Sequence, residues 1–289
     1  MPEQPSRRTF LECSVGAAAG AALVPACSRS DRPRSLATNP DVVRVASVPT
    51  AVEGDLLPGL VHGFSPRVEL MARPDVYDAA RAGKADLVVS HYGHHDCEQF
   101  VLDGLGEWPR TVFSNQMALI GPPSDPARIR GLLDAAVAFE RIARSKSPFV
   151  VNDLDGVRYL TEILWQCIGR PARDGWMIDD KHQKEDAMVV ASRLGGYSLW
   201  GLTPFLRTHR QVSLQLEPLV VADPLLQRLL VAVVVRVPGC NQDGARALQY
   251  HLLAPATQAR IRATRYPTNE QICWVPAGRH NRTAILPLT

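Results

Sequence analysis

TVFSNQMALIG, residues 111–121, is a β-rich run that is long for a strand of a small sheet. A second long run, from Val212 to Val237, is broken at Asp223-Pro224. Proline lacks the amide hydrogen that a central strand needs, so a break is expected there. Both runs are long enough to pass from one lobe to another. They predict a chain whose middle part is an inserted second lobe.

Outward from these runs, short β-rich segments alternate with helical periods, which is typical of α/β architecture with mainly parallel sheets. The remaining predicted strands are 42–47, 68–72, 85–90, 148–152 and 196–200. Predicted helices include 130–144, 156–168, 185–194, 244–253 and 255–263. The resulting division is lobe 1 at 41–115 and 222–289, and lobe 2 at 116–221, with a ligand cleft between them.

The first residues predict export. Ser6-Arg7-Arg8-Thr9-Phe10-Leu11 is a twin-arginine signature, and the apolar run that follows ends at Pro25, short of the ~20 residues of a membrane span. Residues 1–26 are therefore predicted to be a signal peptide, and 27–40 a flexible tether. The segment 23–27 resembles a lipobox, which predicts lipidation at Cys27; ordinary cleavage after Ala26 is the alternative.

Composition excludes some functions. The formal net charge is +3, from 32 Lys and Arg against 29 Asp and Glu, which is too small to indicate nucleic acid or an anionic membrane face as a partner. Cys97, Cys167, Cys240 and Cys273 lack metal or redox spacing and are expected to be buried thiols or at most one disulfide. No enzyme signature is present, so no catalytic residue and no cofactor is predicted.

Several segments resemble, in order, the tungstate-binding or molybdate-binding component of bacterial ABC transporters. They are ADLVVSH (85–91), EQFVLDGLG (98–106), ALIGPPSDPA (118–127), KSPFV (146–150), LW (164–165), GW (175–176) and GYSL (196–199). The resemblance implies a periplasmic binding protein type II fold, with two lobes joined by two hinge strands that close on a small oxyanion. It further implies a monomer in the periplasm or on the outer face of the cytoplasmic membrane, with an ABC transporter permease as partner.

The ligand loops of this family match less well. Ser47-Val48-Pro49-Thr50 keeps two hydroxyls, 153–158 reads DLDGVR in place of a hydroxyl-rich turn, and 200–205 reads WGLTPF without the arginine of the family. Each loop leads into a helix, whose first N–H groups favour an anion. Asp153 and Asp155 are expected to cap their helix, with Arg158 offsetting their charge or lying free in solvent.

The segment 91–97, HYGHHDC, follows a predicted strand and opens a helix. Its imidazoles, carboxylate and thiol could bind zinc or copper, although His94 and His95 are expected to point apart. The favoured interpretation is that His91 and Tyr92 contact the ligand and that His94 or Asp96 caps the helix. The predicted ligand-binding residues are Ser47, Thr50, His91, Tyr92, Asn152, Arg158, Ser198 and Thr203.

Weaker candidates are Asn115 and Gln116, whose amides could face the cleft or serve the structure. Trp108, Trp165, Trp176 and Trp274 are assigned to packing. The sequence thus predicts an exported solute-binding protein for a small anion. The alternatives are a binder of a carboxylate or of a metal, or a sensor or interaction module whose ligand site has been lost.

Overall fold

A computed structural model of the chain describes residues 39–266 and 273–277. The predicted signal peptide, the lipidation site Cys27 and all but the last residues of the tether lie outside this part. Within the described residues, no helix combines the length and apolar character needed to cross a membrane.

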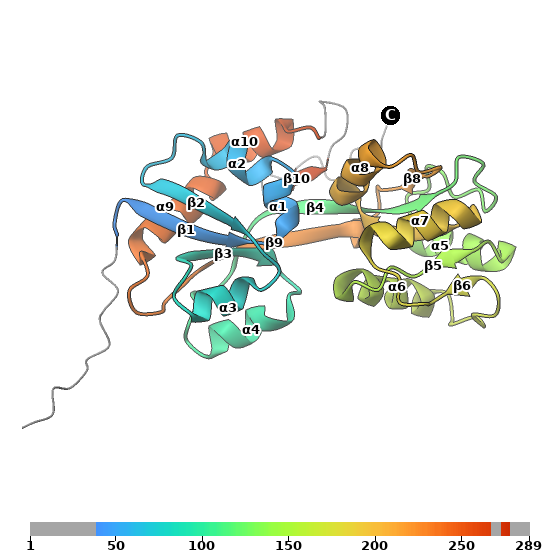
Figure 1. The fold of residues 1–289 in the computed structure, drawn as a ribbon, viewed down its shortest axis with the longest axis horizontal. Helices are drawn as coiled ribbons and strands as arrows, with labels where there is room; N and C mark the ends of the chain where they lie inside the picture. Colours follow the sequence, from blue (N-terminus) through green and yellow to red (C-terminus); the bar gives the residue numbers. More distant parts are fainter. Residues whose placement is uncertain (1–38, 267–272, 278–289) are drawn as a thin grey trace, which may run out of the picture. The chain divides into compact units, whose positions relative to one another are not determined.

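One group of elements contains the first strands and the last helices of the described chain (Figure 1). Its strands are β1 (Val42–Ser47), β2 (Arg67–Ala72), β3 (Leu87–His91), β9 (Gln227–Val234) and β10 (Trp274–Pro276). Its helices are α1 (Pro49–Glu53), α2 (Leu56–Val61), α3 (Val76–Arg81), α4 (His95–Leu102), α9 (Gln242–Leu253) and α10 (Pro255–Ala263).

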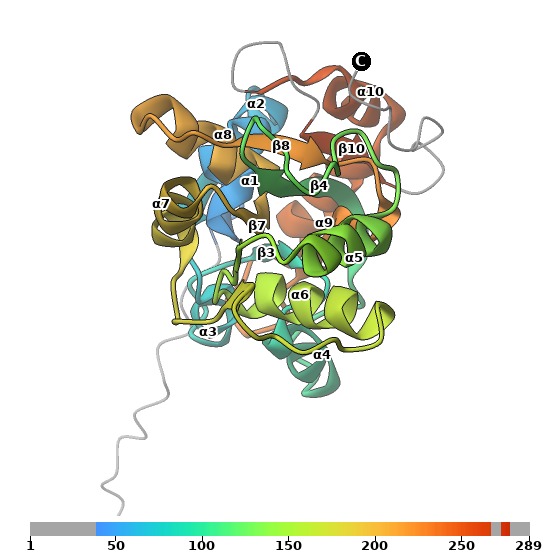
Figure 2. The ribbon, with the colours of Figure 1, turned by 90° about the vertical axis from the view of Figure 1, so that its right-hand side faces the viewer.

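The second group comes from the middle of the chain, and Figure 2 shows its helices gathered around its short strands. The strands are β4 (Arg110–Gly121), β5 (Phe149–Val150), β6 (Met177–Ile178), β7 (Tyr197–Gly201) and β8 (Glu217–Val220). The helices are α5 (Ala135–Ser145), α6 (Asp155–Cys167), α7 (Lys184–Leu194), α8 (Leu202–Gln211) and the 3-10 helix η1 (Pro224–Leu226).

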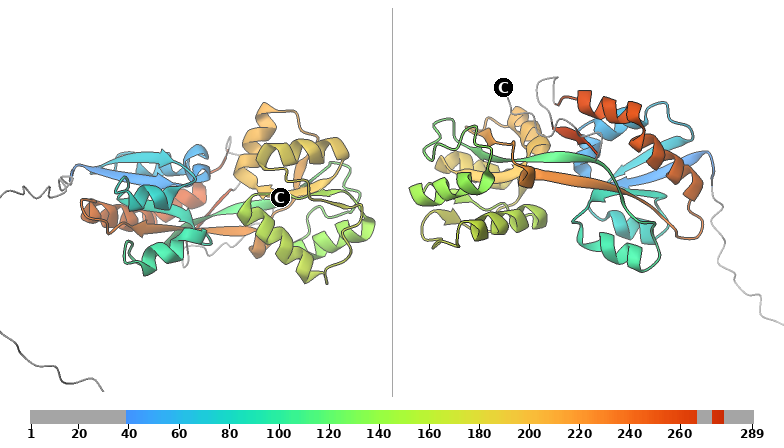
Figure 3. Two further views of the ribbon diagram at one scale, coloured as in Figure 1. Left: turned by 60° about the horizontal axis from the view of Figure 1, so that its bottom comes forward. Right: turned by 180° about the vertical axis from the view of Figure 1, so that it is seen from behind.

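Strands β4 and β9 run side by side between the two groups (Figure 3). The strand order is β2-β1-β3-β9-β4-β7-β5-β6, with β8 and β10 also paired to β4. β4 pairs with β9 up to Gln116, and from Met117 onward with β7 and β8. The two long runs of the sequence therefore connect two α/β lobes, as expected, while the lobe boundaries proposed from the sequence stay a prediction.

The expectation of mainly parallel sheets is wrong at the crossing strands. Within the lobes, β1 pairs in parallel with β2 and β3, and β5 with β6 and β7. By contrast, β4 and β9 are antiparallel to each other, and each is also antiparallel to its other neighbouring strands. The break expected at Asp223-Pro224 is confirmed, because Asp223 accepts a hydrogen bond from the Leu225 N–H and caps η1 between β8 and β9.

Aromatic side chains fill the core of each lobe. Phe139 packs edge-on against Phe149 and Trp176 in the second lobe, and Phe113 packs edge-on against Trp274 in the first. The packing role expected for Trp176 and Trp274 is confirmed, since both are buried. For Trp108 it is wrong, because this side chain is 77% exposed.

The cysteines of the described chain are all free thiols. Cys97, Cys240 and Cys273 are buried, as expected, whereas Cys167 at the end of α6 is exposed. The apolar setting of Cys273 raises the pKa of its thiol to about 12, so this thiol stays protonated and unreactive at neutral pH.

Candidate functional site

Three polar side chains project from one face of the sheet where β3, β9 and β4 lie together. The antiparallel register places His91 opposite Leu230 and Arg228 opposite Asn115. Side chains two residues apart on a strand share a face, so Arg228 lies on the same face as Leu230. His91, Arg228 and Asn115 therefore meet on that face, although they are far apart in sequence.

Arg228 brings a positive charge to the start of helix α6. A Cβ atom placed on Gly156 would lie 2.7 Å from both terminal nitrogens of the Arg228 guanidinium, so the guanidinium rests against this glycine. The sulfur of Met117 is 3.8 Å from Nη1 of Arg228. Across residues 39–266 and 273–277, no carboxylate forms an ion pair with Arg228, and burial lowers its pKa. An arginine stays protonated even so, which leaves an uncompensated cation.

His91 contributes a neutral imidazole beside this cation. Burial, followed by the charge of Arg228, lowers the pKa of His91 to about 3. Its Nε2 lies 3.5 Å from Nδ2 of Asn115. The other amide atom, Oδ1 of Asn115, is buried and has no hydrogen-bond partner within the described part of the chain. The site therefore has one full positive charge and two neutral hydrogen-bonding groups.

Helix α6 begins at this site, and no side chain of residues 39–266 or 273–277 caps its start. Its N-cap is Leu154, whose carbonyl accepts hydrogen bonds from the N–H groups of Val157 and Arg158. The expectation that Asp153 or Asp155 caps α6 is wrong. Asp155 is the first helical residue, while Asp153 binds an arginine side chain. The positive end of the α6 dipole adds to the charge of Arg228.

Arg158 does not face the site as a free cation. Its Nη1 lies 2.7 Å from Oδ1 of both Asp153 and Asp179, and its Nη2 lies 2.6 Å from Oδ2 of Asp179. These bonds raise the pKa of Arg158 and lower that of Asp179. The guanidinium is thus bound by two carboxylates. Its predicted contact with a ligand stays a prediction, and these bonds speak against it.

Three other polar residues make structural hydrogen bonds. The amide of Asn152 binds the backbone N–H and C=O of Lys184 at the start of α7, at 2.9 and 3.4 Å. The hydroxyl of Ser198 donates to the Val150 carbonyl at 2.7 Å. Nε2 of Gln116 donates to the Val221 carbonyl at 2.5 Å. These bonds use the hydroxyl proton of Ser198 and one of the two amide N–H groups of Asn152.

Ser47 lies on the edge of the site. β1 and β3 pair Ser47 with Val89, two residues before His91, so Ser47 shares the face of His91. The Ser47 hydroxyl is buried and donates to the adjacent Val48 carbonyl, at 3.2 Å. Thr50 follows in the first turn of α1, half-buried.

Thr203 lies where α8 meets α1 and β10. A Cβ placed on Gly54 would lie 2.8 Å from Cγ2 of Thr203 and 2.9 Å from Trp274. The Thr203 hydroxyl is buried without a hydrogen-bond partner among the described residues. Arg207 of α8 pairs with Glu53 of α1 beside this contact. Elements of the two lobes therefore touch through Gly54, Thr203 and this ion pair.

Tyr92 and the histidines after it lie at the start of α4. Tyr92 is 59% exposed and lines a pocket with Trp108, His94 and His95. The predicted capping role of His94 is confirmed, because its Nδ1 accepts a hydrogen bond from the Asp96 N–H at 3.4 Å. The expectation that His94 and His95 point apart is wrong, since their rings stack with centroids 4.8 Å apart.

The sequence interpretation missed Arg228. Its signal was an arginine that, with Gln227, interrupts a run of apolar residues, LLQRLLVAVVV at 225–235. The residues of this strand from Leu230 to Val234 are buried. A charged side chain beside such a segment loses solvation, so it needs a charged partner or a ligand to offset that cost.

Two α/β lobes joined by the crossing strands β4 and β9 define the type II periplasmic binding protein fold. The structure is similar to a tungstate-binding protein, TupA, from Desulfovibrio alaskensis G20, at a TM-score of 0.72 and 21% identity over 82% of this chain and 99% of that one. It is also similar to a tungstate ABC transporter structure from Geobacter sulfurreducens, at a TM-score of 0.65 and 21% identity over 77% and 98% of the two chains.

Curated relatives agree with this class. A protein of Haloferax volcanii, provisionally named an ABC transporter anion-binding protein, is 27% identical over 215 residues, which cover 71% of this chain and 63% of that protein. The tungstate-binding protein TupA of Peptoclostridium acidaminophilum is 22% identical over 69% of this chain and 71% of its own. No protein-family model matches the chain. The resemblance seen in the sequence is confirmed, and these relatives are named for binding rather than catalysis.

Proposed function

We propose that this protein binds a small anion against Arg228 and the start of helix α6. The observation that carries the proposal is a largely buried guanidinium, in contact with Gly156, that has no carboxylate partner among the described residues. A buried charge is costly unless it is paired, so an anionic ligand is the natural partner. The unpaired N–H groups at the start of α6 favour the same sign of charge.

The neutral groups around Arg228 would complete the binding shell. His91 and Asn115 share its face of the sheet, and Ser47 lies next along that face. In this arrangement Arg228, from β9, takes the role that the family gives to an arginine in the loop at 200–205. A tungstate-like or molybdate-like oxyanion fits the names of the relatives, and a carboxylate is the alternative ligand.

The wider role we propose follows from these relatives. The protein would deliver its ligand to an ABC transporter permease, and ligand binding would favour the closed arrangement of the lobes. Export by the twin-arginine route, a lipid anchor at Cys27 and a monomeric state on the outer face of the membrane complete the proposal.

The test is isothermal titration of the purified full chain with tungstate, with sulfate as the comparison ligand. Saturable tungstate binding is expected for the natural protein and for Arg193→Ala, which removes an exposed arginine of α7. Arg228→Ala is expected to weaken binding by ~1.5–3 kcal/mol, the usual contribution of hydrogen bonds to a charged group. Equal affinity of both variants would remove Arg228 from the site. Absence of binding by the natural protein to either oxyanion or to small carboxylates would favour a sensor or interaction module.

A further inference from the structure

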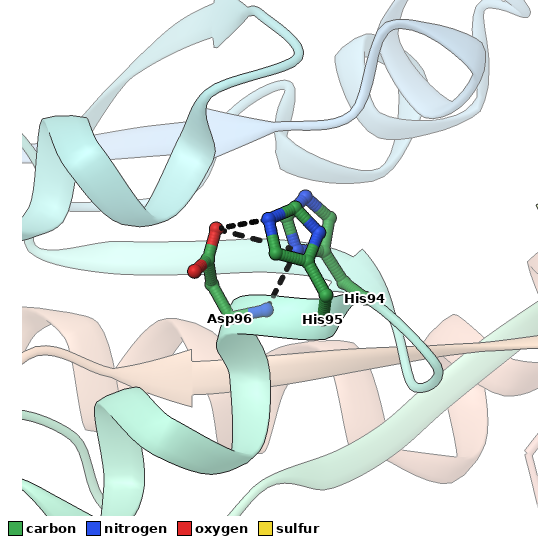
Figure 4. A group of neighbouring side chains, drawn as sticks. All are labelled: His94, His95 and Asp96. Atoms are coloured by element: carbon green, nitrogen blue, oxygen red, sulfur yellow. Dashed lines mark hydrogen bonds and ion pairs between the residues drawn. The ribbon is translucent and has the colours of Figure 1, made fainter. Parts of the chain in front are cut away.

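His94, His95 and Asp96 form a compact group at the start of α4 (Figure 4). One ligand atom from each residue lies within 4.8 Å of the other two. Nε2 of His95 is 3.0 Å from Oδ2 of Asp96, and Nδ1 of His94 is 4.0 Å from the same oxygen. Figure 4 shows the two imidazoles face to face, with the carboxylate turned toward their nitrogens.

The donor set has a definite metal preference. Two imidazoles and one carboxylate suit zinc, copper and nickel, whereas calcium and magnesium prefer sites made only of oxygen. Zinc sites with three protein ligands keep an open position for water or another ligand. We propose that His94, His95 and Asp96 bind one divalent transition metal ion, with Zn²⁺ as the reference ion.

Local folding explains why three consecutive residues can converge. His94 is the N-cap and has an extended backbone, while His95 and Asp96 are already in the first helical turn. This change of direction brings the His94 ring over that of His95, which a continuous helix or strand would not do. Small rotations of the His95 side chain, which is 78% exposed, would bring the donors to bonding distance.

The surroundings can accept a cation. Asp96 and Glu98 place two carboxylates in the first turn of α4, which offset the positive end of the helix dipole. Glu98, His94 and His95 line one pocket, so the group is open to an ion from solvent. His94 has to exchange one long hydrogen bond, 3.4 Å to the Asp96 N–H, for the metal bond.

The experiment is titration of the untagged full chain with Zn²⁺, measured by isothermal calorimetry. A second titration with Co²⁺ in place of Zn²⁺ is measured by the visible absorption of the bound ion. We expect one equivalent to bind, and His95→Ala and Asp96→Asn each to weaken binding at least about tenfold. The matched control is His209→Ala, which removes an exposed histidine of α8 and should bind like the natural protein.

His95 is mostly exposed, so its replacement should leave folding intact, and circular dichroism checks this in both variants. Unchanged Zn²⁺ affinity in folded His95→Ala and Asp96→Asn would overturn the proposal, as would no binding by the natural protein. Anion binding tests the two proposals separately: Arg228→Ala should keep the metal and lose the anion, and His95→Ala should do the reverse.

Discussion

The guanidinium of Arg228 lies directly on Gly156, with both terminal nitrogens 2.7 Å from the position that a Cβ atom would occupy. The contact joins the crossing strand β9 to the first turn of α6. Only a residue without a side chain allows the guanidinium to come this close to the helix end. The pair therefore holds a cation and a set of helix N–H groups at one point.

Gly156→Ala should separate anion binding from stability. The added methyl group would push away the end of a flexible side chain, and alanine is the better helix former by ~1 kcal/mol. We therefore expect an unchanged or slightly raised melting temperature together with weaker anion affinity. Thermal unfolding and calorimetry measure the two. Gly59→Ala, in a helix with open space around the glycine, is the control that should alter stability alone. Full affinity in Gly156→Ala would contradict a ligand site at this contact.

Arg158→Ala should act on stability instead. The variant breaks ion pairs with Asp153 and Asp179. Asp153 keeps Lys181 at 3.8 Å, whereas Asp179 loses its ion-pair partner among the described residues. We expect a loss of about 1 kcal/mol in the free energy of unfolding, as for a good partly exposed ion pair. Since Arg158 lowers the pKa of Asp179, the stabilisation is present above the unfolded pKa of that aspartate and fades as the pH falls below it. Urea unfolding at pH 7 and pH 3 tests this. A selective loss of anion affinity would restore Arg158 to the site.

His91 should make the protein less stable in mild acid. Its folded pKa of about 3 lies below the ordinary value of 6.5, so between these values the unfolded chain binds more protons than the folded one. The free energy of unfolding should fall by at most ~1.4 kcal/mol per pH unit below about 6.5, and the contribution is intact above it. In His91→Asn, urea unfolding at pH 7.5 and pH 5 should show a smaller difference. An identical pH dependence would mean that His91 titrates normally in the folded state.

Gly54→Ala should weaken the contact between α1 and α8. Its Cβ would lie 2.8 Å from both the Thr50 carbonyl oxygen and Cγ2 of Thr203, so backbone as well as side chain has to move. Overpacking of this kind costs ~1–3 kcal/mol. We expect a lower melting temperature than for Gly59→Ala. Equal melting temperatures of Gly54→Ala and Gly59→Ala would show that α1 and α8 can move apart without loss of stability.

The sequence by itself determined the elements and their connection. β1 and the crossing strand at 111–121 lie within a residue of their predicted bounds, because alternation and apolar runs are local properties of a strand. The ordered motifs then indicated the two-lobed fold and its class of relatives. The first residues of helices were less well predicted. Leu154, and not Asp153 or Asp155, is the N-cap of α6, because the backbone turns into the helix at that residue.

The tertiary structure decided which charges are available. From the sequence, Arg158 could offset the charge of Asp153 and Asp155 or lie in solvent, but folding also brings Asp179 to it from a distant loop. Arg228 was not singled out from the sequence, but the pairing of β9 with β4 and the approach of Gly156 leave it half-buried, with no carboxylate paired to it among the described residues. The sequence carries each residue's chemistry, while the register of crossing strands sets which partner reaches it. An electrostatic site depends on such distances, because the energy of a charge is fixed by its nearest neighbours and by its burial.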